Sequence, residues 1–373
     1  MTRTIKCIVV DDSAFMRKSL AMMLESDPQI KVVATARDGK EGIEKIREFQ
    51  PDLVTMDIEM PGMDGLTALG IIMKECPLPV LMVSSLTTDG AKSTLDALNL
   101  GAVDFIPKEL SFVSLDIVKI KEELVSKVRS IVQSRSLQFR LQRIKTASQG
   151  VRDSANAVKG GTAAAAHAVP PRPAAPASIT RRKDLRAVVL GISTGGPFAL
   201  LQTIPKLPKD FPLGIAVVQH MPPRFTKSMA ERLDGLSQVS VKEAEEGDAL
   251  TPGRVLIAPG GQHLTFKHQG SEIVARITAE PVDTLYRPCA DVMMLSAVQA
   301  INAPLLGVIM TGMGKDGLEG LRKIKKGGGM VLAQNEETCV VYGMPKAAVD
   351  DGIADLVLPL EDIPAAMTKI VRG

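Results

Sequence analysis

A serine lies inside a glycine-rich turn, the run GISTGG at residues 191–196. An apolar run at 187–190 precedes this turn, and a helix-like segment from Phe198 follows it. A strand, a sharp glycine turn and a helix, in that order, can expose a serine oxygen as a nucleophile. The same arrangement can cradle a phosphate or form an ordinary tight turn. The motif therefore indicates a reactive Ser193 only if a base and an acid can reach it.

The chain has only four histidines, and elimination favours one of them as the base. His167 lies in an Ala/Pro-rich segment where nothing would position it, and His268 lies among polar residues of an expected hairpin. His263 follows a Pro-Gly-Gly turn and could line the same cleft, although packing within a loop is the more common role. His220 ends an apolar run, so a strand would place it at the same sheet edge as the serine.

The loop TGMGKDG at 311–317 offers an acid after the apolar run at 305–310. Its Asp316 could orient the imidazole, or it could simply cap the helix that follows. Backbone N–H groups of this glycine-rich loop could also bind a developing oxyanion. Asp283 and Asp291 are weaker candidates because neither ends an expected strand. The order serine, histidine, aspartate differs from the Ser…Asp…His order of α/β-hydrolases and argues against that fold.

A second polar cluster is expected at the strand ends of the first half. Asp11 and Asp12 follow the first apolar run and Asp57 the third; Ser84 and Lys108 follow the fourth and fifth. Ligands of open parallel sheets bind at these carboxyl ends. Three converging carboxylates repel one another, which predicts a Mg²⁺ ion between them. The lysine and serine would then contact the oxygens of a phosphoryl group. Each acid alone could be a cap or turn residue, but their joint placement favours this site.

The elements that must position these residues alternate along the chain. In the first half, strand-like runs lie at 5–10, 32–34, 53–56, 80–83 and 103–106, with helices from about Ser13, Lys40, Gly65 and Asp89 and over 117–132. In the second half, they lie at 188–191, 215–218, 255–258, 305–310, 330–333 and 356–358, with an antiparallel insertion at 273–277 at an edge. This alternation predicts an α/β fold with two doubly wound parallel-sheet domains. Pro107 is expected in a cis-like setting that holds the following lysine in the cleft.

The two halves are separated by a segment of low complexity. Fourteen of the eighteen residues at 160–177 are Ala, Pro or Gly, which is typical of a flexible linker. We therefore expect domains at 1–130 and 184–373 joined by a linker at 131–183. Such a linker cannot fix how the domains face each other, so any defined arrangement needs a direct interface.

Composition excludes several classes of function. The net charge is only +3, and the chain has no Trp and two Tyr, which gives no support for nucleic-acid binding. The N-terminus lacks a signal peptide, and no apolar run approaches the ~18 residues that cross a bilayer. The four cysteines are scattered, as expected for reduced thiols. We expect a cytoplasmic monomer without membrane insertion.

The first domain resembles a response-regulator receiver domain. The motifs that carry this resemblance are VVDDS at 9–13, MDIEMPGMDG at 56–65 and FIPK at 105–108. The resemblance implies a flavodoxin-like fold, Asp57 as the phospho-acceptor and a histidine kinase as the phosphodonor. It also places Asp12, Asp57 and the backbone carbonyl of Glu59 around Mg²⁺, and makes Ser84 and Phe105 the switch positions.

The second domain is similar to the catalytic domain of the chemotaxis protein-glutamate methylesterases, the CheB family. The resemblance rests on GISTGG at 191–196, VQHM at 218–221 and MTGMGKDG at 310–317. It implies a Rossmann-like domain with Ser193 as nucleophile, His220 as base and Asp316 as the orienting acid. The Met313 amide, with Thr194, would contribute to the oxyanion site.

Together the two resemblances imply a phosphorylation-regulated hydrolase. It would hydrolyse γ-glutamyl methyl esters on methyl-accepting chemotaxis receptors, releasing methanol, and deamidate certain receptor glutamines, with no cofactor for the esterase step. The unphosphorylated receiver would cover the catalytic cleft. An alternative is a phosphorylation-dependent binding module without catalysis. A DNA-binding regulator is disfavoured, since no helix-turn-helix with a basic recognition helix is apparent.

Overall fold

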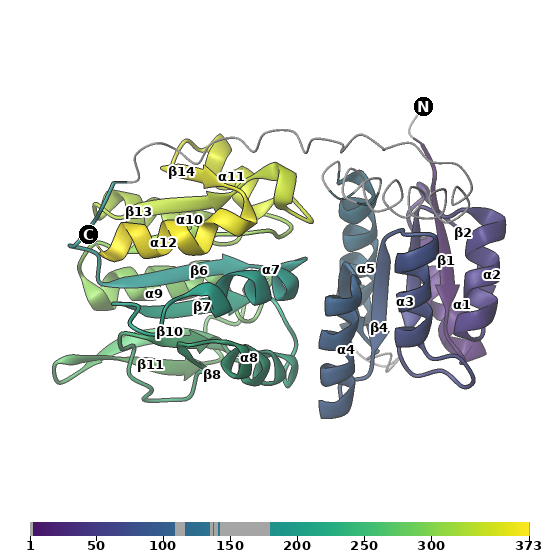
Figure 1. The fold of residues 1–373 in the computed structure, drawn as a ribbon, viewed down its shortest axis with the longest axis horizontal. Coiled ribbons are helices and arrows are strands. Elements are labelled where there is room, and N and C mark those ends of the chain that lie inside the picture. The colour runs from purple at the N-terminus through teal and green to yellow at the C-terminus, as the bar shows by residue number, and fades with distance from the viewer. Residues whose placement is uncertain (1–2, 109–115, 135–136, 138–140, 142–179, 373) are drawn as a thin grey trace, which may run out of the picture.

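The structure is a computed structural model that describes residues 3–108, 116–134, 137, 141 and 180–372. Two α/β units follow one another along the chain, an N-terminal unit and a C-terminal unit that we call the catalytic unit (Figure 1). Most of the expected linker, together with His167, lies outside the described residues. The expected boundaries at 130 and 184 therefore stay predictions. No described helix combines the length and the apolar character needed to cross a membrane.

The N-terminal unit alternates strands and helices as predicted. Its elements are β1 (Ile5–Val10), α1 (Ala14–Leu24), β2 (Ile30–Ala36), α2 (Gly39–Phe49), β3 (Leu53–Asp57), α3 (Gly65–Glu75), β4 (Val80–Ser84), α4 (Thr88–Leu100), β5 (Asp104–Pro107) and α5 (Asp116–Gln133). The strands are parallel in the order β2-β1-β3-β4-β5, which is the flavodoxin-like order. All residues of β3 and β4 are buried, because helices cover both faces of a parallel sheet.

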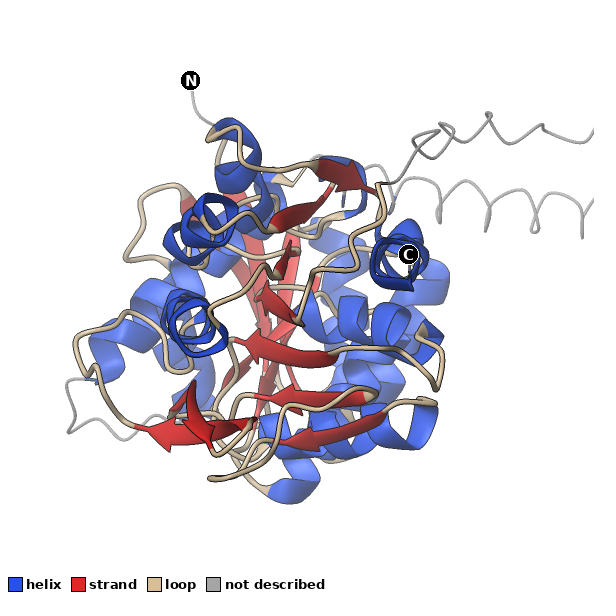
Figure 2. Cartoon of the chain, turned by 90° about the vertical axis from the view of Figure 1, so that its left-hand side faces the viewer, coloured by secondary structure: helices blue, strands red, loops and turns tan. Residues whose placement is uncertain are grey.

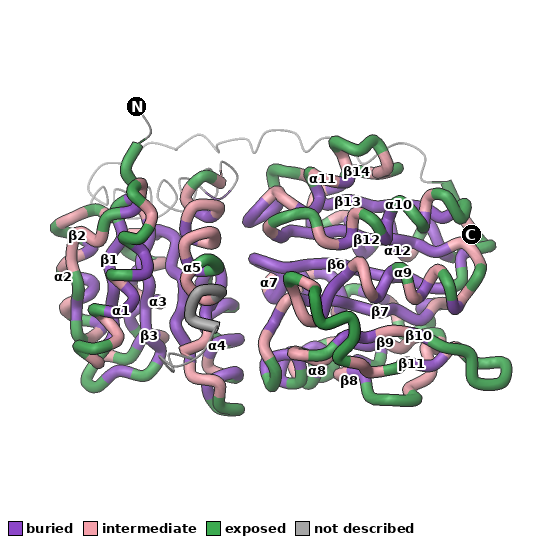
Figure 3. The backbone as a smooth tube through the Cα atoms, turned by 180° about the vertical axis from the view of Figure 1, so that it is seen from behind, coloured by how far each residue is buried: buried purple, intermediate pink, exposed green. Residues whose placement is uncertain are grey.

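The catalytic unit has a larger parallel sheet. Its elements are β6 (Ala187–Ile192), α7 (Gly196–Thr203), η1 (Ile204–Lys206), β7 (Gly214–Gln219), α8 (Phe225–Leu236), β8 (Ser240–Glu243), β9 (Arg254–Ile257), β10 (His263–Gln269), β11 (Glu272–Thr278), α9 (Ala290–Ile301), β12 (Leu306–Ile309), α10 (Leu318–Lys326), β13 (Met330–Gln334), η2 (Glu336–Thr338), α11 (Met344–Asp350), β14 (Leu356–Leu358), η3 (Leu360–Asp362) and α12 (Ile363–Arg372). The sheet order is β14-β13-β12-β6-β7-β9-β8. Figure 2 shows the strands between two sets of helices, and Figure 3 shows the burial of the central strands.

Two features of this unit differ from the expectation. The insertion at 273–277 does not lie at an edge of the main sheet: as β11 it pairs with β10 in a separate antiparallel hairpin. The edge strand β8 was not expected. Only Val241 of its four residues is buried, so the strand carries almost no apolar signal.

The connections between strands run outward in both directions from β6, so the strand order reverses there. This strand lies between β12 and β7, so that Gly191 is paired with Ile309 on one side and Val218 on the other. The loops that follow β12, β6 and β7 therefore begin side by side, at the carboxyl ends of three adjacent strands. A reversal of this kind is where open α/β sheets bind their ligands.

The two units contact each other directly. Helices α4 and α5 lie on the side of the N-terminal unit that faces the catalytic unit (Figure 1), and α4 packs against α7 and α8. Arg232 forms an ion pair with Asp96 at 2.6 Å, and the Arg224 guanidinium donates to the Leu86 carbonyl at 2.8 Å. The defined interface that a flexible linker could not supply is therefore present in the structure.

Candidate functional site

Ser193 occupies the turn between β6 and α7, where the sequence placed it. The backbone strain of the turn falls on Gly195, whose φ of +77° favours glycine, and Ser193 is not among the residues with positive φ. A Cβ on Gly196 would lie 1.9 Å from Oε1 of Gln219. The Ser193 N–H donates to the Thr311 carbonyl at 2.9 Å, which joins the end of β6 to the loop after β12. The glycines thus allow a close approach of three strand ends.

His220 links Ser193 to Asp316, as the sequence predicted. Its Nδ1 lies 3.0 Å from Oγ of Ser193, and its Nε2 lies 2.7 Å from Oδ2 of Asp316. The side chains of His220 and Asp316 are 8% and 7% exposed. With Nε2–H donating to the carboxylate, Nδ1 is left as an acceptor beside the serine hydroxyl. The geometry is therefore that of a nucleophile, a base and an orienting acid.

The Asp316 carboxylate is held by the beginning of helix α9. It accepts hydrogen bonds from the backbone N–H of Ala290 at 2.6 Å and of Asp291 at 3.0 Å, and the Cys289 thiol donates to it at 3.1 Å. Burial alone would raise the pKa of Asp316. The hydrogen bonds from His220 and from the two amides outweigh burial and keep the pKa well below its usual range. The surroundings of Asp316 therefore stabilise its ionised form beside His220.

The thiol of Cys289 stays protonated in this setting. Burial, followed by the nearby Asp316 charge, raises the pKa of Cys289 to about 12. The group acts as a hydrogen-bond donor and not as a thiolate. This contact was not predicted from the sequence, because a cysteine before a helix gives no signal that its thiol faces a carboxylate 27 residues later.

Two amides near Ser193 are available as oxyanion donors. Within the described residues, neither the Met313 N–H nor the Thr194 N–H donates a hydrogen bond. A Cβ at Gly312 would lie 2.8 Å from the Cβ of Ser193, so only glycine lets this loop approach the serine. Both expected oxyanion residues thus lie in the chain next to Ser193 and Gly312, with backbone N–H groups that donate to no described residue.

The remaining candidate residues have other positions. His263 is fully buried, and its Nδ1 accepts from the Cys289 N–H at 3.2 Å, so it packs beneath the site and does not contact the serine. His268 is exposed on β10. Asp283 lies in an exposed loop, and Asp291 accepts from the Gly320 N–H at 2.8 Å as part of the helix packing.

The sequence did not reveal an aromatic neighbour of the histidine. The Tyr286 ring stacks on the imidazole of His220, with centroids 4.1 Å apart and an interplanar angle of 15°. The chain has only two tyrosines, and nothing in the spacing of Tyr286 indicates that it returns to the end of β7.

The acidic site of the N-terminal unit is also assembled. Oxygens of Asp11, Asp12 and Asp57 all lie within 4.8 Å of one another. Lys108 Nζ is 2.5 Å from Oδ2 of Asp57 and 3.3 Å from Oδ2 of Asp11. The Glu59 N–H donates to Oδ1 of Asp57 at 3.3 Å. Pro107 is not preceded by a cis bond, so the cis-like setting was wrong; the pairing of β5 with β4 positions Lys108 instead.

The carboxylates of this site fit a divalent cation. Among the described residues, the buried Oδ2 of Asp11 has only the Lys108 ammonium beside it, at 3.3 Å, and hard carboxylate oxygens are the ligands that Mg²⁺ prefers. Burial raises the pKa of Asp57 to about 6, and Lys108 opposes this increase. A cation in the cluster would stabilise the ionised form of Asp57.

The two residues expected to be switch positions contact elements that pack on the catalytic unit or the unit itself. Ser84 is buried, and its Oγ accepts from the Thr94 hydroxyl of α4 at 2.7 Å. The Phe105 ring stacks on Phe225, the first residue of α8, with centroids 4.5 Å apart. A residue expected to switch within the N-terminal unit therefore also packs on the unit that holds the serine.

Helix α5 covers one side of the serine site. The Ser126 hydroxyl donates to Sδ of Met313 at 2.9 Å, and Met313 packs with a cluster that includes Leu124 of α5 and Val341 of the catalytic unit. The residue whose amide is a candidate oxyanion donor is thus held by its side chain against the other unit.

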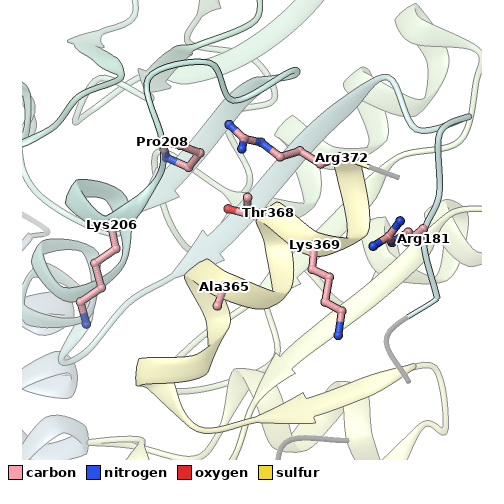
Figure 4. Close-up of a pocket in the computed structure, with 7 residues that line it drawn as sticks. All are labelled: Arg181, Lys206, Pro208, Ala365, Thr368, Lys369 and Arg372. Carbon is pink, nitrogen blue, oxygen red and sulfur yellow. The ribbon is translucent and has the colours of Figure 1, made fainter. Parts of the chain in front are cut away.

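A basic hollow lies elsewhere on the catalytic unit (Figure 4). It has a volume of about 470 Å³ and is lined by Arg181, Lys206, Lys369 and Arg372 among others. Arg372 forms an ion pair with Asp210. None of these residues contacts the serine, the histidine or the acidic cluster, so we assign the hollow no part in the site.

Comparisons with known proteins agree with both sites. Residues 7–118 match the family of response regulator receiver domains, and residues 188–367 match the CheB methylesterase family. The molecule is thus a two-domain response regulator with an α/β output domain that carries a serine–histidine–aspartate arrangement.

The relatives define the family more narrowly. A protein-glutamate methylesterase/protein-glutamine glutaminase of Oleidesulfovibrio alaskensis is 52% identical over 98% of this chain and 99% of its own length, and one of Pyrococcus horikoshii is 44% identical over 100% and 96%. This chain belongs to the protein-glutamate methylesterase/protein-glutamine glutaminase family. The crystal structure of the Thermotoga maritima CheB methylesterase catalytic domain is 47% identical, with a TM-score of 0.49, and covers 50% of this chain and 99% of that one.

Proposed function

We propose that this protein hydrolyses γ-glutamyl methyl esters on methyl-accepting chemotaxis receptors and deamidates specific receptor glutamines. The observation that carries the proposal is the position of His220, 3.0 Å from the Ser193 hydroxyl and 2.7 Å from Asp316. Full-length similarity to methylesterase/glutaminases supports this choice of substrate. An ester and a primary amide both undergo acyl transfer to water, so one serine can serve both reactions.

In the proposed reaction, Nδ1 of His220 takes the hydroxyl proton as Oγ of Ser193 attacks the glutamyl carbonyl carbon. The amides of Met313 and Thr194 stabilise the negative oxygen of the tetrahedral intermediate. The imidazolium, stabilised by Asp316, then protonates the leaving methoxide to give methanol, or the leaving amide nitrogen to give ammonia. Water attacks the acyl-enzyme by the reverse proton path and releases glutamate and free serine.

Control is proposed to come from phosphorylation of Asp57 by a histidine kinase. A bound Mg²⁺, held by Asp12, Asp57 and the Glu59 carbonyl with Asp11 close by, would neutralise charge during phosphoryl transfer. Lys108 is placed to pair with a phosphoryl oxygen, because its ammonium already contacts Asp57. Ser84 could contact the same group after its hydrogen bond with α4 rearranges.

The unphosphorylated receiver is proposed to inhibit the esterase by covering it. The contacts of α5 with Met313 and of Phe105 with Phe225 support this gating. Phosphorylation would shift the balance towards an arrangement in which the receiver leaves the serine accessible. We propose a cytoplasmic monomer, in keeping with the four free cysteines of the described residues.

A Ser193→Ala variant tests the proposal against the alternative of a non-catalytic binding module. Full-length protein is phosphorylated with acetyl phosphate and given a methylated receptor fragment, and released methanol is measured. We expect a loss of at least about 10³-fold in rate, because the substitution removes the proposed nucleophile. A Ser237→Ala variant, which changes a serine at the end of α8, should keep the wild-type rate. Unchanged demethylation by Ser193→Ala would leave only the binding function.

A further inference from the structure

A loop beside the catalytic histidine presents apolar side chains to solvent. We define the 281–288 loop as the central part of the segment between β11, which ends at Thr278, and α9, which begins at Ala290. Leu285 is 85% exposed, more than any other exposed large hydrophobic residue of the described chain, and Val282 is 59% exposed. Isolated exposed apolar residues are ordinary, but two on one short loop next to a reactive site indicate a contact surface.

The loop is fixed in shape by the buried His263 beneath it. Because Nδ1 of this histidine accepts from the Cys289 N–H, its Nε2 carries the proton and donates to the Pro281 carbonyl at 3.1 Å. One ring thus ties both ends of the loop. Arg287 donates to the Val282 carbonyl at 2.9 Å and closes the loop from within. A loop held in this way loses little conformational entropy when a partner binds.

The apolar tip is continuous with the catalytic machinery. Tyr286 packs on the His220 ring, while the neighbouring Leu285 points its side chain into solvent. A protein segment that presents a glutamyl side chain to Ser193 would therefore pass close to this tip. The tip stays exposed even though α5 holds Met313, so the described residues of the receiver do not cover it in this arrangement.

We propose that Val282 and Leu285 form the docking surface for apolar side chains that flank the scissile glutamyl group on the substrate protein. This inference rests on the proposed esterase function. The continuity of the surface with Tyr286 and His220 points to the substrate, and its exposure while α5 holds Met313 argues against the receiver as the occupant. A second copy of this chain is the competing occupant, and it would appear as self-association that the substitutions abolish.

The test compares a large and a small substrate. A Val282→Ser/Leu285→Ser double variant of the full-length phosphorylated protein is assayed on a methylated receptor fragment and on a blocked glutamic acid γ-methyl ester. We expect kcat/KM on the receptor to fall about tenfold or more through a higher KM, since burial of two such side chains contributes binding energy. The rate on the small ester should be unchanged, because it lacks flanking residues.

Two further variants separate docking from a general effect of added polarity. Leu236→Ser changes a leucine that is 58% exposed at the end of α8, away from the strand carboxyl ends, and should keep wild-type kinetics on both substrates. The single variant Leu285→Met should keep most of the wild-type kcat/KM on the receptor, because methionine offers an apolar area similar to that of leucine.

The possible outcomes are distinct. A fall confined to the receptor supports the docking surface. Equal losses on both substrates, or wild-type kinetics on the receptor, overturn it, as does a concentration-dependent dimer that the double variant abolishes while receptor kinetics are kept. If the wild-type protein hydrolyses neither substrate, the proposed function fails, and the docking surface fails with it.

Discussion

Each unit buries a carboxylate at an equivalent place in its sheet, but the surroundings shift the pKa values of the two carboxylates in opposite directions. Asp57 and Asp316 both lie at or beyond the carboxyl end of a parallel strand next to the reversal of strand order. Burial raises the pKa of Asp57 to about 6, whereas the pKa of Asp316 is held well below its usual range. The difference lies in the hydrogen-bond donors around each group.

Asp316 receives two backbone N–H groups from the beginning of α9, a thiol and the imidazole. Such donors, with the positive end of the helix dipole, stabilise its charge without further partners. Within the described residues, the donors to Asp57 are Lys108 and one long N–H contact from Glu59. Asp316, the proposed orienting acid, is therefore surrounded by fixed donors. Asp57, the proposed phospho-acceptor, keeps unsatisfied capacity for a cation and a phosphoryl group.

The largest effect is expected from removing the fixed charge of Asp316. An Asp316→Asn variant should lose about 10³–10⁴-fold in kcat, because the amide can present an N–H to Nε2 and so favour the wrong imidazole tautomer. Methanol release by the phosphorylated protein measures this loss. The matched change Asp283→Asn, in the exposed loop, should leave kcat unaltered; similar losses in both variants would refute the assignment of the acid.

Removing the reactive carboxylate should abolish regulation and leave the chemistry intact. We expect an Asp57→Asn variant to keep the low basal esterase rate and to show no stimulation by acetyl phosphate, because the proposed phospho-acceptor is missing. The rate with and without acetyl phosphate provides the measurement, with phosphate incorporation determined in parallel.

Asp64→Asn is the appropriate control for this loop. Asp64 caps α3 just beyond Asp57, and asparagine is an equally good cap. Its stimulation by acetyl phosphate should match that of the wild-type protein. Persistent stimulation of the Asp57 variant would assign the phosphoryl group to another residue.

The smallest expected effect concerns the buried His263, because burial lowers the pKa of a histidine whereas it raises that of a carboxyl group. Desolvation lowers the pKa of His263 from its ordinary value near 6.5. Below that pH the unfolded chain binds a proton that the folded protein does not, so the free energy of unfolding should fall as pH falls, until the folded-state pKa is reached. Urea unfolding of the catalytic unit between pH 7.5 and 5 measures this change.

A His263→Gln variant isolates the contribution of this one ring. Glutamine does not titrate, so the variant should be less stable at pH 7.5 yet lose less stability on acidification than the wild-type protein. Parallel pH profiles for the two proteins would contradict the assignment of His263 as a buried neutral base.

Much of the fold was predictable, because parallel strands covered on both faces are continuous apolar runs. The runs at 53–56 and 330–333 fall within β3 and β13 for this reason. Strand β8 escaped prediction because it buries only Val241, and the hairpin of β10 and β11 escaped its correct placement because alternation does not reveal which sheet a strand joins.

The site residues at strand ends could be found from sequence because topology alone brings those ends together. Ser193, His220 and Asp316 each follow one of three adjacent strands. Tyr286 and Cys289 could not be found in this way, because their contacts depend on the path of an irregular loop. The interface contacts depend on how two folded surfaces match, which no local pattern encodes.

The stacking of Phe105 on Phe225 has a thermodynamic consequence. If the closed arrangement excludes both the phosphorylated receiver and the protein substrate, the two events share one coupling free energy. Substrate occupancy must then favour the phosphorylated state by the same factor by which phosphorylation favours substrate binding. One aromatic contact would thus let the amount of methylated receptor influence which fraction of the protein is phosphorylated at equilibrium.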